Sequence, residues 1–339
     1  MTQPVKASGH HMAAEIAEAP AVFARAALIN HRAVLAGLNL GDLRAFYTIA
    51  RGSSDAAANI VSYELMRELG RPVTSLPPSV FSLGRGVDMA GSAALVISQS
   101  GASDDLVRSA LGIRKAGGVV LTIVNQPGSA VEAAADATLL IGAGPERAVP
   151  ATKTVIGSIA AGMALISALS PEYQAVAGQS AAAFLQFAEV EHPKASALSA
   201  DLVRSQHVYV IGRDTGFGAA QEVALKLKEC CSLHAEAYSS SEVLHGPLQL
   251  VTKPLLILML DTETPDTKDS LDLAEARFRA AGGVVHRVRP SDVGALGLTP
   301  AAKAALLLYL IYPIVRAVSM ALGQDPDQPA TLSKVTKTI

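Results

Sequence analysis

Charged and aromatic residues are scarce in this chain of 339 residues. Only 17% of the residues are charged and 4% are aromatic, tryptophan is absent, and the net charge is −2. Nucleic-acid binding needs a concentrated basic surface, so this scatter of charges argues against a nucleic-acid partner. Half of the residues are hydrophobic, which is enough for a sizeable core. The length suggests roughly two domains.

Cysteines and membrane signals are equally sparse. Cys230 and Cys231 are the only cysteines, and adjacent cysteines neither staple distant parts of a fold nor complete a zinc spacing. We therefore expect buried thiols in a reducing compartment, with no metal and no other cofactor. The apolar segment 155–169 is too short to span a membrane and the segment 304–322 contains Pro313, so both are interpreted as buried helices. With no secretory signal at the polar start of the chain, a cytoplasmic protein without a membrane partner is predicted.

Three features recur about 162 residues apart in the sequence. The strand-like run at 46–50 is followed by a glycine-containing turn and a helix-like stretch, and the same order recurs from 208–211 onward. Continuous apolar runs at 93–97 and 255–259 are typical of strands that are covered on both faces of a parallel sheet. In the third match, a glycine pair ends a helix just before a strand.

This alternation of strands and helices predicts an α/β fold with two tandem, doubly wound parallel-sheet domains of flavodoxin-like type, related by an internal repeat. A long Ala/Leu-rich helix closes each half. The predicted organisation is an N-terminal helical segment (1–35), a first domain (36–170), a helical linker (171–198), a second domain (199–325) and a C-terminal tail (326–339).

Polar turns follow the first two predicted strands of the first half, where ligands of parallel sheets bind. Hydroxyls and free backbone N–H groups at a helix N-terminus bind phosphate, because the donors and the helix dipole both favour an anion. Ser103 could merely cap its helix, but capping does not require the polar residues before it. A P-loop lysine and a G-x-G-x-x-G turn are both missing, which argues against a nucleotide. The polar residues of the first turn are Gly52, Ser53 and Ser54. Those of the second turn, to which the phosphate argument applies, are Ser98, Gln99, Ser100 and Ser103.

Candidate acid–base groups lie in the second half. Glu222, Lys226 and Glu229 share one face of a predicted helix, although a solvated stripe of ion pairs would have the same spacing. The stretch 234–247, interpreted as a loop, is dense in histidine, glutamate and serine. Histidine titrates near neutral pH, and a glutamate partly withdrawn from water can act as a general base. Acid–base chemistry is therefore possible here.

Seven motifs occur in a fixed order along almost the whole chain: MAAEI at 12–16, SQSG at 98–101, ATK at 151–153, ALKLKE at 224–229, HAEAY at 234–238, EVLHGP at 242–247, and DQP at 327–329 with Lys334. With these motifs the chain resembles the sugar isomerase (SIS) domain family. The resemblance is to the isomerase half of glucosamine-6-phosphate synthase and to the SIS-type glucosamine-6-phosphate deaminases.

The resemblance implies a role for each matching residue. The proton-shuttling glutamate falls on Glu229, with Lys226 one turn earlier, and the ring-opening histidine falls on His245. In the family that histidine comes from the neighbouring subunit, which implies a homodimer with a shared active site. Lys334 would reach the carbonyl end of the open-chain sugar. A sugar phosphate would be held by the seven polar-turn residues, with Val149 and Ala151 close by.

Some positions depart from the synthases. Arg51 stands where they usually have cysteine, Pro150 and Ala151 replace a serine-containing turn, and Leu244 replaces a lysine. No glutaminase domain is recognised, so the resemblance favours hydrolytic deamination of glucosamine 6-phosphate to fructose 6-phosphate and ammonia. The alternatives are a synthase-like isomerase that uses ammonia, a related sugar-phosphate isomerase or fructosamine-phosphate deglycase, and a non-catalytic sugar-phosphate sensor.

Overall fold

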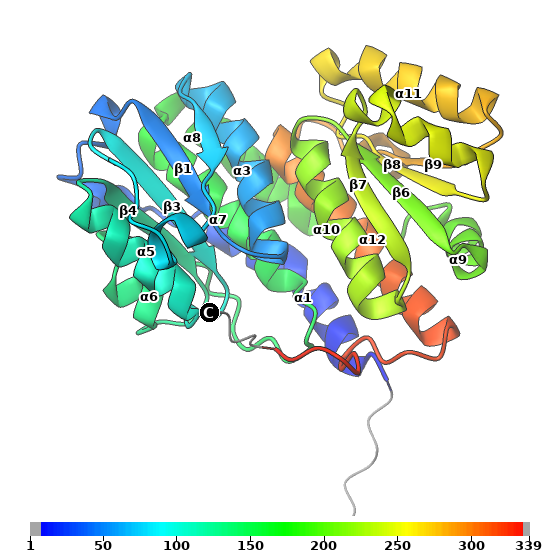
Figure 1. Cartoon of the computed structure of the whole chain (residues 1–339), viewed down its shortest axis with the longest axis horizontal. Coiled ribbons are helices and arrows are strands. Elements are labelled where there is room, and N and C mark those ends of the chain that lie inside the picture. Colours follow the sequence, from blue (N-terminus) through cyan, green and yellow to red (C-terminus); the bar gives the residue numbers. More distant parts are fainter. Residues whose placement is uncertain (1–7, 335–339) are drawn as a thin grey trace, which may run out of the picture.

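A computed structural model describes residues 8–334 and contains two parallel β-sheets (Figure 1). Sheet A has five strands in the order β2-β1-β3-β4-β5, and sheet B has four in the order β7-β6-β8-β9. Every strand pair in the two sheets is parallel. The α/β prediction is confirmed at this level. The shared order of strands is compatible with an internal repeat, which stays a prediction, as do the domain boundaries.

Sheet A is buried on both faces, which is why β3 (Ser92–Ser98) is buried at all seven positions. One face packs against α1, α3 and α7, and the other packs against α5. The remaining strands are β1 (Ala45–Ile49), β2 (Val73–Ser75), β4 (Val119–Val124) and β5 (Ala137–Leu140). The helices around it are α3 (Ser53–Leu69), α4 (Ser79–Ser82), α5 (Asp104–Lys115), α6 (Ala130–Ala133) and α7 (Lys153–Leu169).

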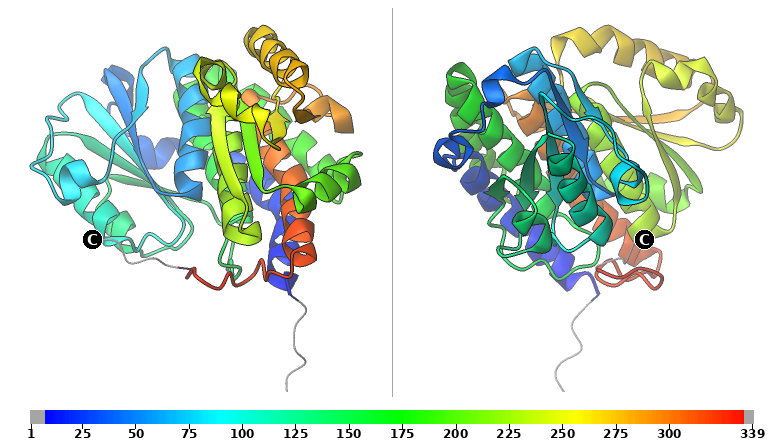
Figure 2. Two further views of the ribbon diagram at one scale, coloured as in Figure 1. Left: turned by 45° about the vertical axis from the view of Figure 1, so that its right-hand side comes forward. Right: turned by 60° about the vertical axis from the view of Figure 1, so that its left-hand side comes forward.

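Sheet B is covered by α10 and α12 on one face, and by α11 together with residues 242–251 on the other. Figure 2 shows the two sheets from two further sides. The strands of sheet B are β6 (His207–Gly212), β7 (His234–Ser239), β8 (Leu256–Leu260) and β9 (Val284–Val288). The helices around it are α9 (Ala195–Arg204), α10 (Thr215–Cys231), α11 (Lys268–Ala280) and α12 (Pro300–Ala321).

One continuous core joins the two sheets through α1 (His10–Ala27), α3, α7, α10 and α12. At the crossing of α3 and α10, a Cβ on Gly218 would lie 2.6 Å from Ile60 Cγ1 and 2.9 Å from Ala56 O, so only glycine fits. The other helices are α2 (Arg32–Leu35) and α8 (Pro171–Phe184). The 3₁₀ helices are η1 (Leu40–Asp42), η2 (Leu185–Phe187), η3 (Glu242–His245), η4 (Pro247–Thr252), η5 (Pro265–Thr267) and η6 (Pro290–Val293).

The predicted apolar helices are buried, as expected. By length and composition α12 could cross a membrane, but 72% of its most apolar window is buried inside the protein. One sequence interpretation is wrong: His234–Ser239 is not loop but strand β7, paired with β6 along its whole length. Its alternation of small, polar and aromatic residues suits an edge strand, which needs no continuous apolar run.

Candidate active site

The carboxyl edge of sheet A brings the predicted phosphate-binding turns together. β1 pairs with β3 and β3 with β4, so the turns after these strands are neighbours. The backbone N of Asn125 donates to Gln99 O at 3.2 Å, which links the turns after β3 and β4. Arg51 Nε lies 2.5 Å from the buried Asp105 Oδ2 and links the turn after β1 to α5. All seven predicted residues therefore belong to one edge.

The serine turn after β3 is held by its own hydrogen bonds. Ser98 Oγ accepts from Gly101 N at 3.1 Å, and Ser100 Oγ accepts from Ala102 N at 3.3 Å. Gly101 has a φ of +60°, and a Cβ there would overlap the Ser129 side chain, so this turn requires glycine. Ser103 occupies the N-cap position of α5, but within residues 8–334 its side chain makes no capping bond. The capping bond of the alternative interpretation is therefore not seen among these residues, and phosphate binding by Ser103 stays a prediction.

Lys226 joins sheet A to the acid–base group of α10. Its side chain is fully buried, and Nζ lies 2.8 Å from Ser53 Oγ, 2.7 Å from Glu229 Oε2 and 3.3 Å from Glu222 Oε1. Burial alone would lower the pKa of Lys226, but Glu222 and Glu229 outweigh burial and raise the pKa above its ordinary value. Lys226 is therefore a protonated bridge, and the three residues are not a solvated stripe.

The two glutamates next to Lys226 differ in exposure. Glu222 is fully buried, accepts from Tyr312 Oη at 3.1 Å, and has one carboxylate oxygen without a partner among the described residues. Burial raises the pKa of Glu222 to about 7. The Glu229 side chain keeps 24% of its surface exposed. Glu229 can therefore meet a substrate, whereas Glu222 is an internal partner of Lys226.

The C-terminal tail runs along the lower side of the molecule in the view of Figure 1, and its Lys334 contacts the loop that follows β5. Lys334 Nζ donates to Glu146 Oε2 at 3.0 Å and to Ala148 O at 2.7 Å. Asp327 O accepts from Val149 N at 2.8 Å, and the Asp327 carboxylate accepts from two backbone N–H groups in the first turn of α1. Val149 thus borders the tail, and Ala151 lies two residues further along the same loop.

Glu146 is a site residue that the sequence analysis did not single out. It is buried, and besides Lys334 it accepts from Thr152 N at 3.0 Å and from Thr154 Oγ1 at 2.6 Å. The charges of Glu222, Glu146 and Glu229 all add to the burial that raises the pKa of Tyr312. Glu146 holds Lys334 to the loop that follows β5.

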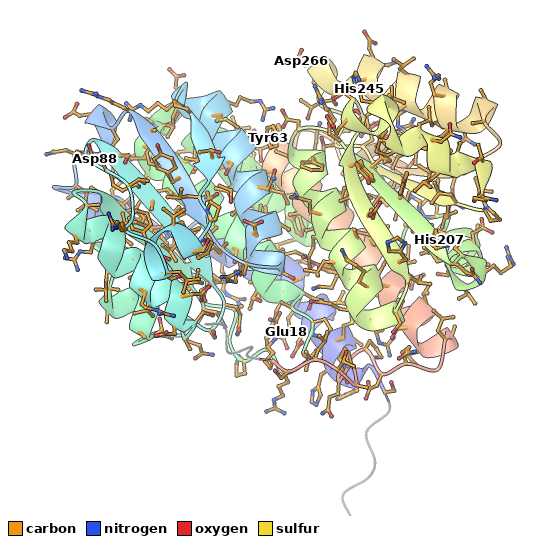
Figure 3. All side chains as sticks on the ribbon, in the orientation of Figure 1. Glu18, Tyr63, Asp88, His207, His245 and Asp266 are labelled. Atoms are coloured by element: carbon orange, nitrogen blue, oxygen red, sulfur yellow. The ribbon has the colours of Figure 1, made fainter. Side chains whose placement is uncertain are left out.

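His245 is not brought to this site within one chain. It lies in η3, beyond the carboxyl end of β7, and is exposed. Helix α10 starts at the carboxyl edge of sheet B and runs back to its amino edge, where Glu229 precedes β7. The six residues of β7 separate these edges by roughly 17–20 Å, at about 3.3 Å per residue. Figure 3 shows His245 near Asp266, at the end of the molecule opposite Glu18 and the tail.

The site offers no obvious place for a metal. Among residues 8–334, no group of three or more histidine, cysteine, aspartate or glutamate side chains could hold a metal ion. Cys230 and Cys231 are free and buried, and burial raises the pKa of both thiols. The polar groups described at this edge are hydroxyls, backbone N–H groups, two lysines and a partly exposed carboxylate.

The sequence profile of the SIS domain matches residues 42–168 and 201–285. Over 96% of its length the chain is 32% identical to the glutamine–fructose-6-phosphate aminotransferase (isomerizing) of Aeropyrum pernix, of which it covers 57%. The chain thus spans little more than half the length of the curated relatives that it matches.

Solved structures are similar over nearly the whole chain. A crystal structure described as that of a phosphosugar isomerase from Silicibacter pomeroyi is 29% identical, with a TM-score of 0.80 over 94% of this chain and 99% of that one. The glucosamine-6-phosphate deaminase of Thermotoga maritima has a TM-score of 0.71 at 20% identity, over 97% of this chain and 100% of that one. At that identity the second likeness shows the fold alone.

Proposed function

This chain belongs to the SIS domain family, and we propose that it is a sugar-phosphate isomerase whose substrate lies between sheet A and α10. The observation that carries the proposal is the bridge from Ser53 through Lys226 to Glu229. It joins the edge suited to a phosphate with a carboxylate suited to moving a proton. A solvated or purely structural ion pair does not require the partly exposed Glu229 carboxylate to lie beside the carboxyl edge of sheet A.

The residues suggest a sequence of steps for an open-chain sugar phosphate. The hydroxyls and backbone N–H groups of the turns after β1 and β3 hold the phosphate. Glu229 removes the proton from C2 and returns it to C1, while Lys226 keeps the Glu229 carboxylate in place. Lys334 stabilises the negative charge that develops on the sugar oxygen. These steps exchange an aldose for a ketose.

Within this class we favour glucosamine 6-phosphate as the substrate. Moving its C2 proton to C1 leaves a ketimine at C2, and water then hydrolyses the ketimine to fructose 6-phosphate and ammonia. The named substrate of the aminotransferase relatives is fructose 6-phosphate, the product of this deamination. Release of ammonia from the amino sugar separates this reaction from a simple aldose–ketose isomerisation. Assembly of the amino sugar from fructose 6-phosphate and free ammonia would favour the synthase-like alternative, and no turnover in either direction would favour a sensor.

We further propose that two chains form a homodimer in which His245 of each chain completes the site of the other. The support is the position of His245, which is exposed at the far edge of sheet B from Glu229. An isologous pair repeats this exchange twice, so both sites are complete. The free buried thiols fit a reducing cytoplasm.

Mixing two inactive variants tests both the chemistry and the sharing. Alone, Glu229→Gln and His245→Ala should each release ammonia 10²–10⁴-fold more slowly, since each lacks one proton-transfer group. After mixing and subunit exchange, about half of the dimers are mixed and each has one intact site, so about a quarter of the wild-type rate should return. The control Glu191→Gln removes an exposed carboxylate and should behave as wild type. Near-normal turnover by Glu229→Gln would contradict the chemistry, and no recovery on mixing would contradict the shared site.

A further inference from the structure

Arg213 makes contacts that the proposed chemistry does not use. It follows β6 directly, and its Nη1 donates to Ser239 Oγ at 2.8 Å and to Ser241 Oγ at 2.5 Å. Ser239 is the last residue of β7, and Ser241 is the N-cap residue of η3. One guanidinium therefore holds both ends of the short turn that leads to His245.

The rest of this turn is fastened to the body of sheet B. Ser240 is fully buried; its N donates to Gly212 O at 2.9 Å, and its Oγ lies 2.7 Å from Ser270 Oγ on α11. Leu244 N then donates to Ser241 O at 3.2 Å. Because η3 is built on Ser241, a displacement of Ser241 is passed directly to His245.

The residues after His245 are held less directly. Tyr209 Oη donates to Pro247 O at 3.2 Å, and Gly246, between His245 and Pro247, has a φ of +149°. Val243 is buried under η3, while His245 itself is exposed. The direction of the exposed His245 side chain therefore depends on how the residues on both sides of it are held.

We propose that Arg213 is a positioning residue for His245, the group assigned to ring opening, and this inference rests on the proposed function. Its Nη1 donates to two hydroxyls at once, which sets the direction of the turn as well as its distance from β6. A misplacement of about 1 Å in a reacting group can cost 10²-fold in rate. Arg213 thereby affects ring opening indirectly, through His245, from the carboxyl edge of sheet B.

Two substrates separate this role from a general loss of structure. One is glucosamine 6-phosphate, which must be opened; the other is an analogue without the 4- and 5-hydroxyl groups, which closes neither a furanose nor a pyranose ring. Arg213→Met should lower kcat/KM about 10–100-fold on the first and less than about threefold on the second. Arg213→Lys, which keeps a cationic donor on a shorter side chain, should lie between Arg213→Met and wild type. The control Arg204→Met removes an arginine of α9 that is 71% exposed and should change neither value.

The ring resonances of His245 give a readout that does not need turnover. They are assigned by their loss in His245→Ala, and in Arg213→Met they should shift and broaden while the other histidines keep their positions. Equal losses on both sugars, no loss on the cyclic sugar, or an unchanged His245 resonance would each overturn the positioning role. If the wild type turns over neither sugar, the proposed function fails, and the His245 resonance still decides the role of Arg213.

Discussion

The carboxyl edges of the two sheets are filled by different kinds of polar group. At sheet A, serine side chains bond to the backbone of their own turn, and Ser103 makes no capping bond within the described part of the chain. At sheet B, charged side chains bind one another: Arg287 lies 2.6–2.9 Å from Asp261, Asp272 and Glu275 and is only 6% exposed. The same order of strands therefore carries a serine-rich turn at one carboxyl edge and a network of paired charges at the other.

Sheet B contributes to the site through the other end of its helix. Helix α10 starts at the carboxyl edge of sheet B and carries Lys226 and Glu229 toward sheet A, where Lys226 reaches Ser53. The close crossing of α3 and α10 at Gly218 fixes this approach. A parallel sheet can thus serve an active site with the carboxyl end of its strands or, through its helices, with the opposite end.

The largest effect is expected from removing Lys226, which bridges sheet A and α10. Lys226→Met leaves Glu222 and Glu229 beside each other without a counter-ion, and breaking one partner of a buried ion pair lowers the free energy of unfolding by about 3–5 kcal/mol. Urea unfolding measures the change. The control is Lys303→Met on α12, where Lys303 Nζ lies 3.3 Å from Glu263 O, and it should cost about 1 kcal/mol or less.

A double variant sharpens that test. Glu222→Gln removes one of the two carboxylates that lose their counter-ion in Lys226→Met. The double variant Glu222→Gln/Lys226→Met should therefore be more stable than Lys226→Met alone. If Lys226→Met were as stable as Lys303→Met, the bridge would not hold the sheets together.

The next test compares buried carboxyl groups on α3 and α10. Glu64 accepts from Tyr173 Oη at 2.8 Å and Glu222 accepts from Tyr312 Oη at 3.1 Å; burial raises the pKa of each to about 7. In the unfolded chain each group has its ordinary pKa of 4.5. Between these values the folded state binds more protons, so stability is full below pH 4.5 and falls as the pH rises toward 7.

For Glu64 this loss amounts to about 3 kcal/mol, at 1.36 kcal/mol per pH unit. Glu64→Gln keeps an acceptor for Tyr173 but removes the charge, so its unfolding free energy should fall less than that of the wild type between pH 4.5 and 8. Urea unfolding at several pH values measures this difference. Glu222→Gln should show a smaller difference, because Lys226 offsets the charge of Glu222. Parallel curves for wild type and Glu64→Gln would contradict the assignment.

Much of the fold could be predicted because its signals are local. Strands covered on both faces are continuous apolar runs, so β3 and β8 were found within one residue of their observed bounds. β7 was missed since an edge strand can alternate small, polar and aromatic residues, as His234–Ser239 does. β2, only three residues long, has no pattern at all.

The site was predictable only as far as it is local. The helical spacing placed Glu222, Lys226 and Glu229 on one face, but their burial depends on α12 and α3, which the spacing does not contain. The bond from Lys226 to Ser53 joins residues 173 positions apart. Glu146 was missed for the same reason: its importance comes from Lys334 on the distant tail, and its only local signal is a charge within a loop in a chain poor in charge.

The smallest test uses two serines at helix N-termini. Ser170 caps α8 by accepting from Tyr173 N, and Ser170→Ala should lower the free energy of unfolding by about 1 kcal/mol without changing the affinity for a sugar phosphate. Ser103 makes no such bond in residues 8–334, so Ser103→Ala should leave unfolding unchanged and weaken sugar-phosphate binding about tenfold, the worth of one hydrogen bond to a charged group. Urea unfolding and titration calorimetry with fructose 6-phosphate measure the two effects. If Ser103→Ala unfolded more easily and bound as well as wild type, Ser103 would be a cap, and the carboxyl edge of sheet A would lose this contact to the sugar phosphate.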